Sequence, residues 1–249
     1  MHNNRYIITF VLVMTAIVAL VLALMSTALK PIHDKNEAVY NKRAILAAVE
    51  SDLGTKVASL SDNDVIEIFN NQITQKVFDM AGNELDKAAV EAKGYKGGLA
   101  EHIDMSKDSR KPEAERILPT YIFKSKDGKS KTIVSVRGNG LWDEIWGNVA
   151  LESDLNTISG IVFDHKAETP GLGAEIKDNL AFPKAFEGKK IYDANGNYKS
   201  VDVVKGGVSN PEHQVDAISG ATITTVGVGE MMIRGIKYYE PSFSKLKSN

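Results

Sequence analysis

Asp216-Ala-Ile-Ser-Gly-Ala-Thr-Ile-Thr-Thr225 is the most informative stretch of this chain, and Val226-Gly-Val-Gly-Glu-Met-Met-Ile-Arg-Gly235 follows it directly. The second segment has apolar residues at helical intervals, which predicts a helix that begins beside the hydroxyl cluster. The first N–H groups of a helix lack intrahelical partners and the helix dipole is positive there, so a phosphate is well held at this place. A threonine hydroxyl here can bond a phosphate or carry one covalently, whereas an ordinary Ser or Thr helix cap explains the same residues without a ligand.

Strand patterns precede this segment. Residues 118–125 and 131–137 flank Lys126-Asp-Gly-Lys-Ser130, a turn with Asp-Gly near its centre, which predicts a β-hairpin. Further strands are expected at residues 65–69, 75–79, 155–164 and 198–204. Together with the C-terminal helix they predict an α+β fold, with an antiparallel sheet and helices packed on it.

The N-terminus carries a long apolar run. Residues 6–29 are 24 residues without a charge, flanked by Arg5 and Lys30. At about 1.5 Å per residue they span roughly 36 Å as a helix, enough for a bilayer core of about 30 Å. A cleaved signal peptide is the alternative, with Ser26-Thr-Ala28 as its cleavage site, but its apolar core would be shorter. We therefore expect one transmembrane helix, continued by a helical stalk over residues 34–53 that Gly54 stops.

The flanking charges bear on orientation. Arg5 lies before the apolar run, and Lys30, Lys35, Lys42 and Arg43 lie after it. Counted by the positive-inside rule, these charges put the large domain in the cytoplasm.

Composition excludes several kinds of site. The chain has no cysteine, which excludes disulfides, thiolate metal ligands and cysteine nucleophiles. A net charge of −2 gives no electrostatic case for a nucleic-acid partner.

Two glycine-rich segments precede the hydroxyl cluster. Gly138-Asn-Gly-Leu-Trp142 lacks the third glycine and the βαβ setting of a dinucleotide fingerprint. It predicts a tight turn that presents Trp142 to a flat ligand or to the core, while Trp146 is expected to pack. Glu168-Thr-Pro-Gly-Leu-Gly173 predicts a rigid loop. His165 with Glu168 offers only two metal ligands, so no metal site is expected.

These motifs share a family resemblance. Asp216-x-x-Ser-Gly-Ala-Thr222 resembles the flavinylation motif of the FMN-binding domain family. Four further features resemble the NqrC branch of that family, which belongs to the sodium-translocating NADH:quinone reductases. These features are the segments 138–147 and 165–176, Lys205-Gly-Gly, and the hydrophobic N-terminus.

The resemblance implies a cofactor and its site. FMN would be joined through its phosphate to Thr222 by a flavin transferase that uses FAD as donor. Thr224 and Thr225 lie close enough to compete as acceptors, but we expect them to cap the helix, and Lys205 would stabilise an anionic reduced ring. The residues implied in cofactor binding are Ser219, Gly220, Ala221, Thr222, Thr224, Trp142, Glu168, Thr169, Gly171, Leu172, Gly173 and Lys205, with Asp216 as a motif residue.

The resemblance also implies a function. The chain would relay electrons within a membrane sodium-pumping NADH:quinone oxidoreductase, with no substrate turnover alone. Its partners would be the A, B, D, E and F subunits, the flavin transferase and membrane lipid. The flavin domain would lie on the periplasmic side of the bacterial inner membrane, against the charge count above. The alternatives are the equivalent subunit of the Rnf-type ferredoxin:NAD oxidoreductase complex and a non-redox anchored scaffold.

The expected organisation follows from these assignments. It comprises a tail (1–5), a transmembrane anchor (6–29), a helical stalk (30–54), an N-terminal extramembrane part (55–117), an FMN-binding domain (118–240) and a C-terminal tail (241–249).

Overall fold

The computed structural model describes residues 4–125 and 128–247, in two compact units, Met1–Asn41 and Lys42–Asn249. Helix α1 (Asn4–Ala47) makes up the described part of the first unit and continues into the second. Its most apolar window has a mean hydropathy of 3.0, so the helix is long and apolar enough to cross a membrane. The expected anchor and most of the expected stalk are therefore one uninterrupted helix, followed by α2 (Glu50–Leu53). Gly54 ends α2 with a φ of +68°, as the sequence predicts.

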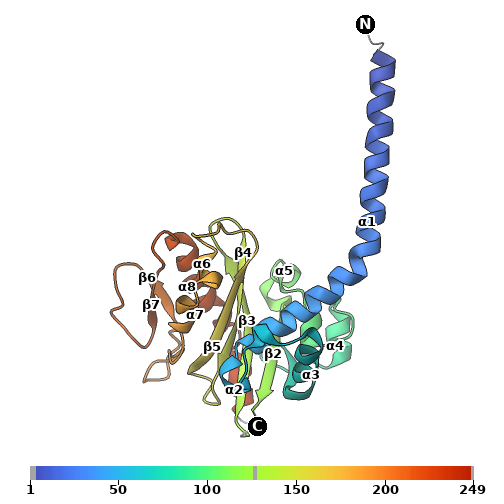
Figure 1. The fold of residues 1–249 in the computed structure, drawn as a ribbon. Coiled ribbons are helices and arrows are strands. Elements are labelled where there is room, and N and C mark those ends of the chain that lie inside the picture. Colours follow the sequence, from blue (N-terminus) through green and yellow to red (C-terminus); the bar gives the residue numbers. More distant parts are fainter. Residues whose placement is uncertain (1–3, 126–127, 248–249) are drawn as a thin grey trace. The chain divides into compact units, whose positions relative to one another are not determined.

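A five-stranded antiparallel sheet organises the second unit (Figure 1). The strands lie in chain order: β1 (Ile73–Asp79), β2 (Ile117–Lys124), β3 (Ser130–Asn139), β4 (Glu144–Leu151) and β5 (Ile158–His165). The predicted hairpin is confirmed, since β2 and β3 pair from Lys124↔Ser130 to Thr120↔Val134. Of the turn between them, Lys126 and Asp127 lie outside the described residues.

Two strand predictions need correction. Residues 65–69 belong to helix α3 (Asp62–Gln72), because Ser61 and Asp64 form a capping box that starts a helix there. Val65 and Phe69, four residues apart, form its buried face. Of residues 198–204, only β6 (Asp202–Val204) is a strand, and it pairs in parallel with β7 (Gln214–Asp216). Strand β4 is not among the strands expected from the sequence.

Helix α8 (Thr222–Lys237) packs against the middle of the sheet. Glycines allow the close approach: a Cβ on Gly235 would lie 2.9 Å from the Val136 side chain, and one on Gly138 would lie 2.7 Å from Met231 Cβ. The α+β fold with an antiparallel sheet and packed helices is therefore confirmed. Helices α6 (Glu175–Asp178) and α7 (Ala181–Lys184) contact β5, and they lie with α8 and the β6–β7 pair beside the sheet (Figure 1).

Short elements complete the second unit. They are η1 (Val57–Ser59), α4 (Lys87–Ala92), η2 (Ala100–His102), α5 (Met105–Asp108), η3 (Glu113–Glu115) and α9 (Glu240–Leu246).

Candidate functional site

Thr222 is the first residue of α8 and keeps its hydroxyl free. Ala221 precedes it as N-cap, and no side chain caps this helix. The first backbone bond runs from the Thr225 N–H to the Ala221 carbonyl, so the N–H groups of residues 222–224 have no backbone acceptor within the described chain. The half-buried Thr222 hydroxyl likewise hydrogen-bonds no group among residues 4–125 and 128–247. One hydroxyl and three N–H groups are therefore available at the positive end of a helix.

A tight turn leads into this helix start. The Ala221 N–H donates to the Ile218 carbonyl at 3.0 Å, and Gly220 has a φ of +83°. The third position of such a turn needs a positive φ, which glycine adopts without strain. Ser219 and Gly220 are exposed. The turn thus leaves the backbone at Gly220, close to Thr222, exposed to solvent.

The other two threonines of the motif face inward. Thr225 is buried and its hydroxyl donates to the Ala221 and Thr222 carbonyls, at 3.1 Å each. Thr224 is also buried and its hydroxyl donates to Glu168 Oε2 at 2.6 Å. Neither one caps the helix, so that prediction was wrong: the backbone direction points both side chains into the core.

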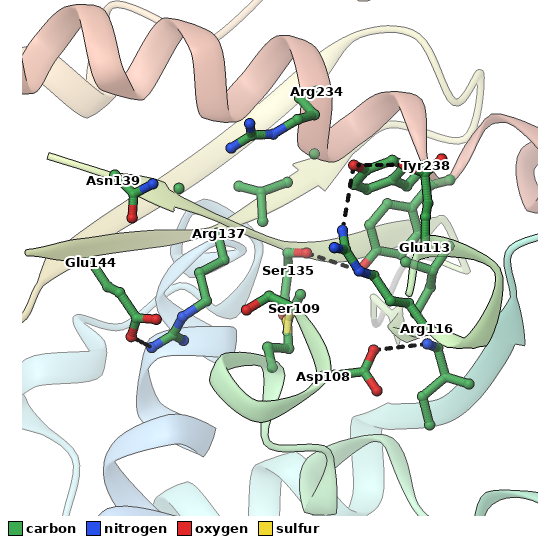
Figure 2. Close-up of a pocket in the computed structure, with 17 residues that line it drawn as sticks. Asp108, Ser109, Glu113, Arg116, Ser135, Arg137, Asn139, Glu144, Arg234 and Tyr238 are labelled. Carbon is green, nitrogen blue, oxygen red and sulfur yellow. Dashed lines mark hydrogen bonds and ion pairs between the residues drawn. The ribbon is translucent and has the colours of Figure 1, made fainter. Parts of the chain in front are cut away.

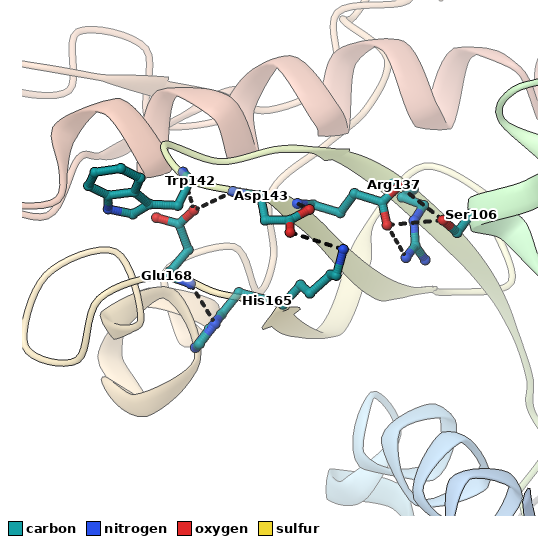
Figure 3. A network of polar contacts seen from close by, with 8 residues as sticks. Ser106, Arg137, Trp142, Asp143, His165 and Glu168 are labelled. Atoms are coloured by element: carbon teal, nitrogen blue, oxygen red, sulfur yellow. Dashed lines mark hydrogen bonds and ion pairs between the residues drawn. The ribbon is translucent and has the colours of Figure 1, made fainter. Parts of the chain in front are cut away.

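Glu168 is a buried residue held by several hydrogen bonds, and Figure 3 shows those that join it to Trp142, Asp143 and His165. Its side chain is 4% exposed. Besides the Thr224 hydroxyl, it accepts the Trp142 N–H at 2.8 Å and the Asp143 N–H at 3.4 Å through Oε1. The Glu168 N–H donates to His165 Nδ1 at 3.2 Å. One carboxylate therefore joins the β3–β4 turn, the loop after β5 and the first turn of α8.

Two glycines make room for this carboxylate. A Cβ on Gly140 would lie 2.9 Å from Glu168 Cδ and closer still to Oε1. A Cβ on Gly173 would lie 2.7 Å from Thr224 Oγ1 and closer still to Glu168 Oε2. A side chain at either position would force the Glu168 carboxylate out of its present place. The sequence motifs contain both glycines, but only the fold shows that they surround the same carboxylate.

The loop after Glu168 is tightly turned. The Leu172 and Ala174 N–H groups both donate to the Thr169 carbonyl at 3.1 Å, and Gly171 has a φ of +73°. The Thr169 side chain is exposed, and Leu172 is 47% exposed. A Cβ on Gly220 would lie 3.5 Å from Leu172 Cδ2. The loop therefore presents an apolar side chain next to the turn that precedes Thr222.

Trp142 points away from the core. Its side chain is 68% exposed while its backbone N–H is held by Glu168. Of the two roles that the sequence left open, packing in the core is excluded. Leu141 and Ile223 are exposed as well. Nothing in the sequence pattern singles out these two residues, because an exposed apolar side chain in a turn or a first helical turn has no local signature.

Lys205 and Asp216 lie at the same end of the β6–β7 pair. Val204 pairs with Asp216, and the Ala217 N–H donates to the Val204 carbonyl at 2.8 Å. Both side chains are exposed, and neither has an ion pair or hydrogen bond within the described chain. Asp216 therefore does not brace the turn, and its carboxylate is available to solvent.

Hydrogen bonds within the network around Glu168 shift the pKa of one of its carboxylates, that of Asp143. Hydrogen bonds from the Glu144 N–H and from Lys166 hold the pKa of Asp143 below its usual range. His165 uses Nδ1 to accept the Glu168 N–H, and no group of three possible metal ligands occurs in the described parts of the chain.

The residues present fit a flavin mononucleotide. The free hydroxyl and N–H groups at the start of α8 suit a phosphate, and exposed apolar side chains flank them. Of the predicted residues, Thr224 and Glu168 are buried and hydrogen-bonded to each other, so they support the site structurally. A cavity of about 320 Å³ lies elsewhere, under the C-terminal half of α8, and none of the predicted site residues lines it (Figure 2).

Comparisons with known proteins point to the same kind of ligand. Residues 140–237 match the FMN-binding domain family. The C-type subunit of the Na(+)-translocating NADH-quinone reductase from Neisseria meningitidis (serogroup A) is 34% identical, covering 96% of this chain and 92% of that protein. The corresponding Pseudomonas aeruginosa protein is also 34% identical, covering 88% of each chain.

Two solved structures are similar. The crystal structure of the C-type reductase subunit from Parabacteroides distasonis has a TM-score of 0.70 and 31% identity, covering 89% of this chain and 98% of that one. Shewanella oneidensis NqrC has a TM-score of 0.70 and 27% identity, covering 86% and 99%. Of the two complexes considered from the sequence, these findings favour the sodium-translocating reductase.

Proposed function

Since the chain belongs to the NqrC family, the C-type subunits of the Na(+)-translocating NADH-quinone reductases, we propose that it holds FMN covalently on Thr222 and relays electrons within that complex. The observation that carries the attachment is the contrast among the three threonines. Thr224 and Thr225 are buried and hydrogen-bonded, whereas the Thr222 hydroxyl is free at the start of α8.

Attachment exchanges a phosphoanhydride bond of FAD for a phosphoester bond to the protein. The Thr222 oxygen bonds the phosphorus of the FMN half of FAD, the pyrophosphate bond breaks, AMP leaves, and the hydroxyl proton is released. No His or Lys lies within the motif to act as a base, so a flavin transferase is expected to activate the hydroxyl. The exposed Ser219, Gly220 and Asp216 form the surface that this partner would contact.

Bound FMN would supply one- and two-electron transfer. Leu172 and Trp142 offer apolar surface for its ring. The exposed Lys205, which directly follows β6, offers a positive charge. Glu168 acts as a positioning residue, because both its oxygens are engaged with backbone and Thr224 donors. The protein contributes attachment and placement, and the remaining subunits supply the other steps.

The attachment is tested by intact mass and peptide mapping of the chain from a host with an active flavin transferase. Wild type is expected to gain the mass of one FMN less one water, localised to Thr222. Thr222→Ala is expected to lose all of it. Thr55→Ala, which removes an exposed threonine hydroxyl outside the predicted flavin site, is the control and keeps the modification. An unmodified wild-type peptide contradicts covalent attachment, and modification retained in Thr222→Ala places it on another residue.

We also propose that α1 anchors the chain once in the inner membrane, with the second unit in the periplasm. The absence of cysteine in the chain allows a clean labelling test. Asn195→Cys introduces a thiol in an exposed turn, and Asn4→Cys introduces one before the apolar run. A membrane-impermeant thiol reagent added to the periplasm is expected to label only Asn195→Cys, and the reverse pattern would place the domain in the cytoplasm.

A further inference from the structure

Strands β2 and β3 separate along their length. Their pairing ends at Thr120↔Val134, yet β2 remains paired with β1 and β3 remains paired with β4 as far as Asn139. Along residues 135–139, β3 therefore has a strand on one side only. The Tyr239 hydroxyl bridges the start of this opening, within 3.1 Å of the Pro119 carbonyl and 2.8 Å of the Ser135 carbonyl.

The opening is a cavity of about 320 Å³ (Figure 2). Its walls come from β2, β3, the C-terminal half of α8 and the segment 105–116. Three arginines line it: Arg137 on β3, Arg234 on α8, and Arg116 just before β2.

The open edge of β3 offers backbone donors. Alternate residues of a strand bond to opposite neighbours. The Gly140 N–H donates to the Asp143 carbonyl on the β4 side, so the N–H groups of Arg137 and Asn139 point the other way, towards the cavity. Neither N–H has an acceptor among the described residues.

Arg137 adds a buried donor. Its Nε is buried and has no hydrogen-bond partner within residues 4–125 and 128–247. The rest of the guanidinium is fixed, because Nη2 donates to Glu144 Oε2 at 2.8 Å and the guanidinium carbon lies 5.0 Å from the centre of the Trp146 ring. A buried donor without an acceptor is costly, so this N–H calls for a ligand or an ordered water.

Arg234 supplies the unpaired charge of the cavity. It is exposed and makes no ion pair with the described residues. Arg116, by contrast, already donates to the Lys111 carbonyl at 3.0 Å and stays near Tyr238.

Two of the three acidic side chains in the wall, Asp108 and Glu144, are ion-paired, and the third, Glu113, is exposed. Asp108 accepts from the Tyr95 hydroxyl and the Ile117 N–H, and it pairs with Lys111 at 3.0 Å. Glu144 accepts from Arg137 and Ser106. Glu113 makes a 3.5 Å contact with the Tyr238 hydroxyl. Among the described side chains of the cavity, the groups that remain without a partner are therefore the donors Arg137 Nε and the Arg234 guanidinium, and the Arg137 and Asn139 carbonyls share the open edge of β3 with their N–H groups.

We propose that this cavity binds a small oxyanion of the carboxylate or phosphate class. Arg137 Nε and the Arg137 and Asn139 N–H groups would hold it from β3, and the Arg234 guanidinium would close over it. The volume is at the lower end of the range for small-molecule sites, roughly 300–1,000 Å³, which fits a compact anion. The site shares no residue with the predicted flavin site, so it stands or falls independently of the proposed function.

The test is isothermal titration calorimetry of the full chain in detergent, with inorganic phosphate and malonate as separate probes at constant ionic strength. Saturable binding of one probe is expected, and the probe that binds identifies the class of anion. Arg234→Gln is expected to weaken binding at least about ten-fold, because a charge-assisted hydrogen bond is lost. Lys237→Gln removes a charge from the same helix outside the cavity and is expected to change the affinity less than about two-fold.

Amide chemical shifts give a site-specific readout in the same titration, with the largest changes expected at Arg137 and Asn139. The proposal is overturned if neither probe binds saturably. It is equally overturned if Arg234→Gln and Lys237→Gln weaken binding alike, or if the shifts of Arg137 and Asn139 do not move.

Discussion

The two ends of α8 differ in how far the polar groups around them are hydrogen-bonded. At its start, the buried Glu168 carboxylate accepts three hydrogen bonds, two from the β3–β4 turn and one from α8, and the Thr222 hydroxyl and its neighbouring N–H groups stay available. Under its C-terminal half, donors exceed free acceptors, and Arg137 Nε is left without a partner among the described residues. The proposed attachment site thus leaves one threonine hydroxyl free among hydrogen-bonded neighbours, whereas the proposed anion site is built around donors that have no acceptor in the described parts of the chain.

Removing the Glu168 carboxylate should have the largest effect on stability. Glu168→Ala leaves the Trp142 N–H and the Thr224 hydroxyl without acceptors and opens a void, so unfolding should become easier by about 3 kcal/mol. Glu168→Gln keeps the shape and can still accept from Trp142 while donating to Thr224, so its cost should be roughly 1 kcal/mol. Urea unfolding followed by circular dichroism measures both, and equal losses would show that the hydrogen bonds do not matter.

Filling the space beside Glu168 should cost nearly as much. Gly173→Ala puts a methyl group against the Glu168 and Thr224 oxygens, and the expected loss is about 2–3 kcal/mol. Gly171→Ala in the same loop meets nothing within 4 Å but must keep a φ of +73°, so about 1 kcal/mol is expected. Thermal unfolding compares the pair, and a Gly171 variant less stable than the Gly173 variant would contradict the packing argument.

At the other end of α8, the Tyr239 bridge can be removed without changing volume much. Tyr239→Phe deletes the hydroxyl shared by the Pro119 and Ser135 carbonyls, at an expected cost of about 1 kcal/mol. Amide hydrogen exchange should quicken first at Ile117, Leu118 and Ser135. Unchanged exchange there would mean that the opening between β2 and β3 does not depend on this bridge.

The smallest effect expected is a pH-dependent one at Glu144. Its hydrogen bond and charge interaction with Arg137 lower its pKa from the usual 4.5. A lowered folded-state pKa contributes stability above the unfolded value, and this is lost as pH falls through the folded value. Wild type should exceed Glu144→Gln by less than about 1 kcal/mol at pH 7, since the pair is partly exposed. Urea titrations at about pH 7 and about pH 3.5 should show this difference shrinking, and a constant difference would rule out the ion pair as its source.

Local pattern predicts the fold where periodicity is clear. The hairpin of β2 and β3, strand β5 and helix α8 overlap the segments expected from the sequence, with boundaries that differ by a few residues. The alternation in Val65-Ile-Glu-Ile-Phe69 predicts a strand, but the capping box at Ser61 starts a helix instead. Strands β6 and β7 have three residues each, too few to show a period. The domain boundaries remain predictions.

Neighbouring residues along the chain were enough to specify the apolar N-terminal helix, the antiparallel hairpin and the hydroxyl cluster at the start of α8. Long-range packing was needed to show that Thr222 is free while Thr224 is held, that Glu168 points inward and that Trp142 points outward. Thr224 and Glu168 are 56 residues apart. Their hydrogen bond forms because α8 packs on the sheet through Gly138 and Gly235, and no local pattern contains a contact of that range.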